Sequence, residues 1–151
     1  MKDDFEHSTG LSEEVSRNCM LTRARRVSRV ITGIYDQALR PHGINAPQFS
    51  LLVLITRLGG ATRAEIGRAN AQERSTLSRN LELLLKEGWV VEGQAEGRSR
   101  PITISLAGRT VLEQAAPGWR AAQETTRNLL GETGASAILT LGDSVEEHHF
   151  A

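Results

Sequence analysis

The chain has 151 residues, with 18 basic and 18 acidic side chains and a single cysteine, Cys19. This length suits one domain with a real core, or a small domain extended by helices that pack on a partner. The even charge balance gives no net attraction to DNA or to a membrane surface, and one cysteine excludes an internal disulfide framework. The first ten residues, MKDDFEHSTG, lack the apolar centre of a signal peptide, and no apolar run approaches the roughly 20 residues that span a bilayer. We therefore expect a cytoplasmic protein with no membrane partner.

The charges are unevenly distributed along the chain. Residues 15–40 carry six arginines and one acid, whereas residues 1–14 carry five acids and one base. Residues 111–151 carry six acids and two bases. Acidic ends on either side of a basic helix could pair within or between subunits, or each face could be solvated independently.

The first expected element is a long helix over residues 13–40, after a flexible polar leader at 1–12. Six apolar residues with 4-3-4-3-4 spacing place one stripe on this helix: Met20, Ala24, Val27, Ile31, Ile34 and Ala38. Pro41 and Gly43 end it. The next helix begins near Pro47, runs through the apolar stretch QFSLLVLITRL and ends at Gly59-Gly60.

Two shorter helices and a hairpin follow. Thr62 and Glu65 have the spacing of a capping box, which predicts a helix from Thr62 to about 69. Another helix begins near Glu73, buries Leu77, Leu81, Leu84 and Leu85, and ends at Gly88. The segments 89–91 and 102–105 are predicted to be strands joined by the polar loop GQAEGRSRP. Helical patterns resume at 106, with a kink or an interruption expected at Pro117-Gly118 and a last helix over about 135–149.

Three helices followed by a hairpin, over residues 45–106, is the order of a winged helix-turn-helix. Its third helix enters the major groove of DNA, and ERSTLSRN (73–80) is the exposed first half of that helix. Hydroxyls and guanidinium groups there can bind phosphates and base edges, and arginines near the hairpin tip can reach the backbone or the minor groove. The candidate DNA-binding residues are Arg63, Arg74, Ser75, Thr76, Ser78, Arg79, Asn80, Arg98 and Arg100.

Three stretches of the chain resemble the MarR family of bacterial transcriptional regulators: RPHGINAPQFSLLVLI, ERSTLSRNLELLLKEGWV and EGRSRPITISLAGRTVL. The resemblance covers nearly all of the chain. The last stretch is similar to the family's wing signature, whose places are filled by Glu96, Gly97, Arg98, Ser99 and Gly108. Glutamate stands where the family usually has aspartate at Glu73 and Glu96, and the resemblance implies that Glu96 braces the wing loop.

The resemblance implies a mainly α fold with a small β-hairpin wing, in which a winged helix-turn-helix is flanked by N- and C-terminal dimerisation helices. Residues 13–44 and 107–151 would interlock two chains into a homodimer, and each chain would read half of a pseudo-palindromic operator on double-stranded DNA. The function implied is a repressor that a small-molecule inducer, such as an aromatic or phenolic acid, releases from DNA.

Two alternatives remain open at the level of sequence. One branch of the family senses hydroperoxides through a cysteine near the start of its first helix, where Cys19 lies, and Arg17 and Arg23 could favour its thiolate. A winged helix can also serve protein–protein association. The adjacent His148 and His149 lack metal-ligand spacing, and no catalytic constellation or phosphate-binding loop is present. We therefore expect no metal, no cofactor and no enzymatic activity.

Overall fold

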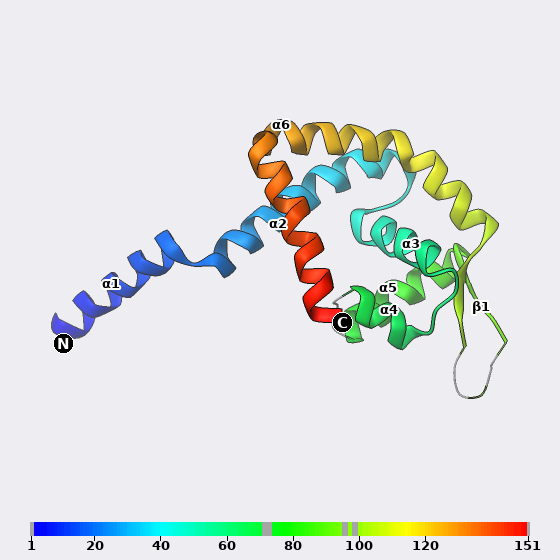
Figure 1. Ribbon diagram of the computed structural model, residues 1–151, viewed down its shortest axis with the longest axis horizontal. Coiled ribbons are helices and arrows are strands. Elements are labelled where there is room, and N and C mark those ends of the chain that lie inside the picture. The colour runs from blue at the N-terminus through cyan, green and yellow to red at the C-terminus, as the bar shows by residue number, and fades with distance from the viewer. Residues whose placement is uncertain (1, 71–73, 95–96, 98–99, 151) are drawn as a thin grey trace. The chain divides into compact units, whose positions relative to one another are not determined.

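The computed structural model describes residues 2–70, 74–94, 97 and 100–150, and the side chains within 10–145 of these ranges. The chain divides into two compact units, Met1–Gly33 and Ile34–Ala151. Helix α1 (Lys2–Asn18) lies in the first unit, and helix α2 (Met20–Leu39) begins there. Figure 1 shows the break between α1 and α2 in the blue part of the ribbon.

The sequence predicts a flexible leader at 1–12 and a single helix over 13–40. The structure has two helices instead. The helical segment begins at Lys2, and it is broken at Cys19. The Cys19 amide still donates to the Val15 carbonyl (3.0 Å), and the Cys19 carbonyl accepts from the Arg23 amide (3.3 Å). Asparagine and cysteine are weak helix formers, so Asn18 and Cys19 are a soft point in an otherwise helical segment.

The second unit contains the three central helices and the hairpin. A 3-10 turn (Arg40–His42) leads to α3 (Ala46–Leu58), α4 (Arg63–Asn70) and α5 (Arg74–Lys86). Helix α3 begins with a capping box between Asn45 and Gln48, a signal that sequence reasoning passed over. The strands β1 (Val90–Glu92) and β2 (Ile102–Ile104) lie within one residue of the predicted segments 89–91 and 102–105, and α6 (Leu106–Phe150) follows.

The core lies between α3, α4, α5 and the hairpin. It is made of buried aliphatic side chains: Leu39, Ile44, Leu51, Leu52, Ile55, Ala61, Ile66, Leu77, Leu81, Leu84, Val90, Ile102 and Ala115. Three of the four leucines predicted for the buried side of α5 are buried, and Leu85 packs against the cluster. Residues of α5 and of both strands contribute to this one core, so the helix and the hairpin pack together.

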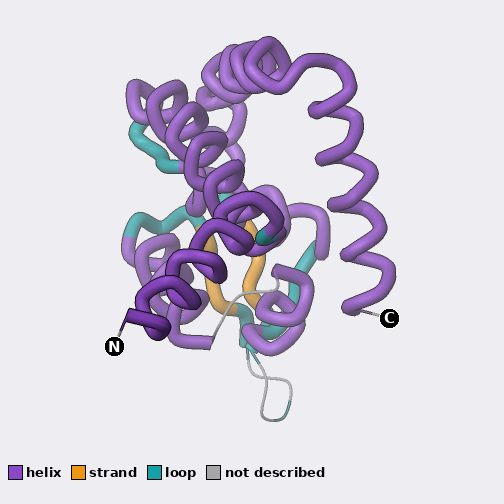
Figure 2. The backbone as a smooth tube through the Cα atoms, turned by 90° about the vertical axis from the view of Figure 1, so that its left-hand side faces the viewer, coloured by secondary structure: helices purple, strands orange, loops and turns teal. Residues whose placement is uncertain are grey.

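The two strands lie side by side (Figure 2). They are antiparallel, with Val90 opposite Ile104 and Glu92 opposite Ile102. Ala61 forms a bridge to Ile102 on the other side of β2, with hydrogen bonds of 2.8 and 3.2 Å. The sequence did not predict this third short pairing. It attaches the hairpin to the turn that precedes α4.

The structure has no interruption of the helix at Pro117-Gly118, whereas the last helix expected from about residue 135 does follow a break. Helix α6 continues through Pro117, and the non-helical dihedral angles within it are at Gly131 (φ 68°, ψ 170°). Gly118 serves close packing instead, because a Cβ there would lie 2.5 Å from the Ala38 carbonyl oxygen and 2.9 Å from the His42 ring. A proline and a glycine can each be tolerated in a helix when tertiary packing compensates.

Candidate nucleic-acid interface

Helix α4 is fixed at its start by the predicted capping box. The Glu65 carboxylate accepts from the Thr62 amide (2.8 Å) and the Thr62 hydroxyl (2.9 Å), and the Glu65 amide donates to the Thr62 hydroxyl (3.3 Å). These hydrogen bonds lower the pKa of the Glu65 carboxyl. Local hydrogen bonds between Thr62 and Glu65 therefore stabilise the N-terminus of α4.

Helix α5 presents a polar outer face and buries the opposite side. Arg74, Ser75, Thr76 and Arg79 are exposed. Among the described residues, no ion pair involves Arg74 or Arg79, so both guanidinium groups are free for another partner. A helix with unpaired arginines and hydroxyls along one side suits contact with phosphates and base edges.

Ser78 and Asn80 lie at the margins of this face. Both are half-buried, because each adjoins the buried stripe of Leu77, Leu81 and Leu84 on one side. They lie near the same surface, but their side chains are less exposed to solvent than those of Ser75 and Arg79. Glu73 lies outside the described residues.

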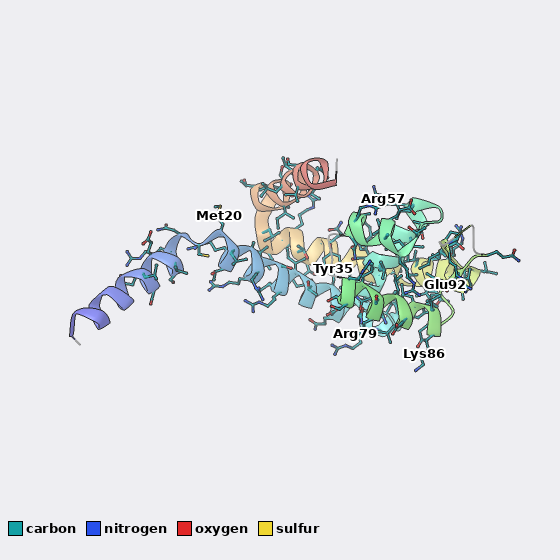
Figure 3. The ribbon with its side chains drawn as sticks, turned by 90° about the horizontal axis from the view of Figure 1, so that it is seen from below. Met20, Tyr35, Arg57, Arg79, Lys86 and Glu92 are labelled. Atoms are coloured by element: carbon teal, nitrogen blue, oxygen red, sulfur yellow. The ribbon has the colours of Figure 1, made fainter. Side chains whose placement is uncertain are left out.

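Lys86 extends the outer face and was not predicted. It is exposed, and it lies seven residues after Arg79, which is two turns of helix on the same side. Figure 3 shows Arg79 and Lys86 projecting outward from the same edge of α5. The helical period alone could have identified it.

The hairpin brings Arg100 beside the base of the wing. Arg100 is exposed and lines a shallow hollow with Glu92, Gly93 and Gln94. The Gly93 amide donates to the Pro101 carbonyl (2.7 Å) and closes the base of the loop. The predicted residues Arg98, Glu96 and Ser99 lie outside the described residues, so their proposed contacts stay predictions.

The segment before α6 is hydrogen-bonded to the turn that precedes β1. The Ser105 hydroxyl donates to the Gly88 carbonyl (2.6 Å) and accepts from the Gly108 amide (3.1 Å). A Cβ on Gly108 would collide with the Trp89 carbonyl oxygen and would lie 2.8 Å from Ile104. The wing signature needs glycine at this position because the backbone of Trp89 occupies the space of a side chain.

Arg63, a candidate DNA-binding residue, is exposed and forms an ion pair with Glu92. Its Nη2 and Nε atoms both donate to Oε1 of Glu92, at 2.7 and 3.3 Å. The pair joins the first residue of α4 to the last residue of β1. Sequence reasoning missed Glu92 because the two residues are far apart along the chain.

Cys19 lies at the break between α1 and α2 and is half-buried. Hydrogen bonds from the Thr22 side chain and then the Thr22 amide, whose nitrogen is 3.5 Å from the sulfur, lower the pKa of the thiol. Arg23 contributes a smaller effect in the same direction. Thr22, not the arginines named from the sequence, is the main cause.

Within the described ranges, no cluster of three histidine, cysteine or acidic side chains could hold a metal ion. None of the described helices is long and apolar enough to cross a membrane.

Comparison with known proteins identifies relatives. Residues 42–100 match the sequence model of the MarR family. The transcriptional regulator MosR of Mycobacterium tuberculosis, solved in complex with DNA, is 33% identical, with 86% of this chain and 98% of that chain covered and a TM-score of 0.72. No curated protein matches the sequence.

Two more distant structures share the fold. A cysteine-to-serine mutant of MarR from Escherichia coli, complexed with operator DNA, is 18% identical with a TM-score of 0.76, covering 87% of this chain and 96% of that chain. BpsR of Bordetella bronchiseptica, whose DNA binding is regulated by 6-hydroxynicotinic acid, is 20% identical with a TM-score of 0.73, covering 85% and 93%. These matches confirm the expected mainly α fold with a two-stranded wing.

Proposed function

Because the chain belongs to the MarR family of transcriptional regulators, and is a regulator rather than an enzyme, we propose that it is a homodimeric repressor of a pseudo-palindromic operator. The observation that carries this proposal is the outer face of α5, whose exposed arginines form no ion pair among the described residues and which lies over a buried aliphatic core. MosR, the 33% identical relative, was solved with DNA bound. A DNA-binding regulator of this kind acts in the cytoplasm.

A homodimer is supported by apolar side chains that the single chain leaves uncovered on its terminal helices. Met20 is 86% exposed, and Leu129, Leu139 and Leu141 are each about 60% exposed. A twofold partner would cover such residues and would present two copies of α5 to successive major grooves. The segments 13–44 and 107–151 remain our proposal for the dimerisation helices.

We also propose that a small aromatic or phenolic acid acts as inducer. Arg40, from the turn after α2, lines a cavity with Asp36, Gly43 and Asn45 at the start of α3. Asp36 already accepts a hydrogen bond from the Ala46 amide (2.7 Å), so Arg40 is the charge left to meet a carboxylate. For BpsR, DNA binding is regulated by an acid of this class.

The proposal is tested by fluorescence anisotropy of the purified protein on the DNA upstream of its own gene, at two salt concentrations and with competitor DNA. Tight, competitor-resistant binding that weakens steeply with salt supports a specific regulator. Salicylate or 6-hydroxynicotinate should release the DNA from the parent protein and not from Arg40→Ala. The contrary result is weak, salt-independent binding both to this upstream DNA and to sites selected from a library of random sequences. It would favour a protein-interaction module instead.

A second candidate function is release of DNA by an oxidant. It is supported by the lowered pKa of the Cys19 thiol at a helix break. Peroxide should then release DNA from the parent and not from Cys19→Ser. If peroxide releases both proteins equally, Cys19 is not the sensor.

A further inference from the structure

We propose that Glu92 is a positioning residue for DNA binding, because its ion pair with Arg63 holds the wing at a fixed angle to helix α4. This inference rests on the proposed function. It also assigns Arg63 a role that acts through Glu92, in place of the direct DNA contact expected from the sequence.

The pair is close and partly protected from solvent. Two guanidinium nitrogens of Arg63 donate to one oxygen of Glu92, at 2.7 and 3.3 Å, and the Glu92 side chain is 27% exposed. The Arg63 side chain is 43% exposed. Partial burial reduces the screening that makes most surface ion pairs ineffective.

The pair spans the whole width of the small sheet. Strand β2 lies between β1 and Ala61, since Ile102 pairs with Glu92 on one side and with Ala61 on the other. Arg63 follows Ala61 by two residues and meets Glu92 at the far edge. The ion pair therefore connects, through side chains, the two segments whose backbones each pair with β2.

The position of Glu92 on the hairpin explains why this connection sets the wing angle. Side chains two residues apart on a strand share a face, so Glu92 shares the face of Val90, which is buried in the core. Glu92 lies at the outer end of that face, where apolar packing stops. Strands of three residues are marginal without support, so the Ala61 bridge and the ion pair fix the base of the wing.

The alternative is that Glu92 competes with DNA for Arg63, and the two roles predict opposite signs. Removal of an acid near a DNA-binding surface normally strengthens binding, because it removes repulsion of the phosphates. If Arg63 binds phosphate, Glu92→Gln frees it, tightens binding and steepens the salt dependence. If Glu92 positions the wing, Glu92→Gln weakens binding and makes the salt dependence shallower, because wing arginines lose their contacts.

The experiment measures anisotropy on the DNA site that the parent binds, as a function of salt, for Glu92→Gln, Arg63→Gln and the double variant. Each single variant should lose about fivefold in DNA affinity, which is the upper end of the effect of a partly exposed ion pair. The double variant should lose no more than either single variant, because both remove the same interaction. The matched control is Glu113→Gln, which removes an exposed acid of α6 that has no ion pair among the described residues. Tighter binding by Glu92→Gln than by this control would overturn the proposal.

A measurement without DNA separates this inference from the proposed function. Hydrogen exchange of the Gly93 and Ile102 amides, which bond to Pro101 and Ala61, should be faster in Glu92→Gln than in the parent or the control. If the parent binds no specific DNA, the proposed function fails, and the exchange rates still decide whether the pair holds the wing. Unchanged exchange contradicts the inference, and so does faster exchange without a loss of affinity on a site that the parent binds.

Discussion

Tyr35 donates a 2.6 Å hydrogen bond to the side-chain oxygen of Gln123, and so joins the end of α2 to the middle of α6 across 88 residues of sequence. Partial burial raises the pKa of the Tyr35 phenol above its ordinary value of 10.0. The phenol therefore remains a protonated donor at every pH at which a regulator works.

Tyr35→Phe should lower the free energy of unfolding by about 1 kcal/mol, the usual net value of one hydrogen bond. Since the folded-state pKa is raised, the contribution is fully present below pH 10 and is lost only as the pH rises through the folded-state value. Urea unfolding at pH 6 and pH 9 should give the same difference between variant and parent. A difference that fades by pH 9 would show that the phenol ionises earlier than its burial implies.

Gly108→Ala should destabilise the protein by about 1–3 kcal/mol, because the new methyl group collides with the backbone of Trp89. Gly142→Ala, in the same helix, has open space around its Cβ and is the matched control. It should be neutral or stabilise by up to about 1 kcal/mol. Thermal unfolding of both variants measures this difference in stability. Equal stability of the two variants would contradict the close approach of Trp89 to Gly108.

Thr126→Val should stabilise the protein by about 1 kcal/mol. Thr126 is 8% exposed, and its hydroxyl oxygen is buried without a hydrogen-bond partner among the described residues. Valine keeps the shape and removes the unsatisfied group. The control is Thr125→Val, whose exposed hydroxyl donates to the Ala121 carbonyl (3.0 Å) and should change stability little. A loss of stability in Thr126→Val would reveal a partner for this hydroxyl.

Thr22→Val should raise the pKa of the Cys19 thiol, because it removes the largest of the interactions that favour the thiolate. The rate of alkylation by iodoacetamide, measured against pH, should shift its midpoint upward. Thr32→Val, an exposed threonine further along α2, should leave the midpoint unchanged. If Thr22→Val also leaves it unchanged, the hydrogen bond does not hold in solution.

The parts of this fold that local chemistry determines could be predicted from the sequence. The Thr62–Glu65 capping box and the buried leucines of α5 depend on spacing within one helix, and the structure confirms both. The Ala61–Ile102 bridge and the Arg63–Glu92 pair could not be predicted, because they join segments about 30 to 40 residues apart.

Breaks in helices were the least predictable feature. Pro117-Gly118 has the composition of a break, yet α6 continues there because Gly118 packs closely against Ala38 and His42. The non-helical dihedral angles fall instead at Gly131, close to the start near residue 135 that was expected for the last helix. On α5, the predicted residues Arg74, Ser75, Thr76 and Arg79 are exposed, whereas Ser78 and Asn80 are half-buried; their contacts with DNA stay predictions.

The central claim is that the outer face of α5 reads DNA sequence. Its most direct test is the ratio of two affinities, one for the DNA site that the parent protein binds specifically and one for random DNA. The parent should favour its site by about 1,000-fold or more. Arg79→Ala should reduce this ratio by about 5- to 160-fold, which corresponds to about 1–3 kcal/mol. Lys86→Ala, at the far end of the same face, should leave the ratio unchanged. An Arg79→Ala variant that keeps the parent's ratio would contradict the account.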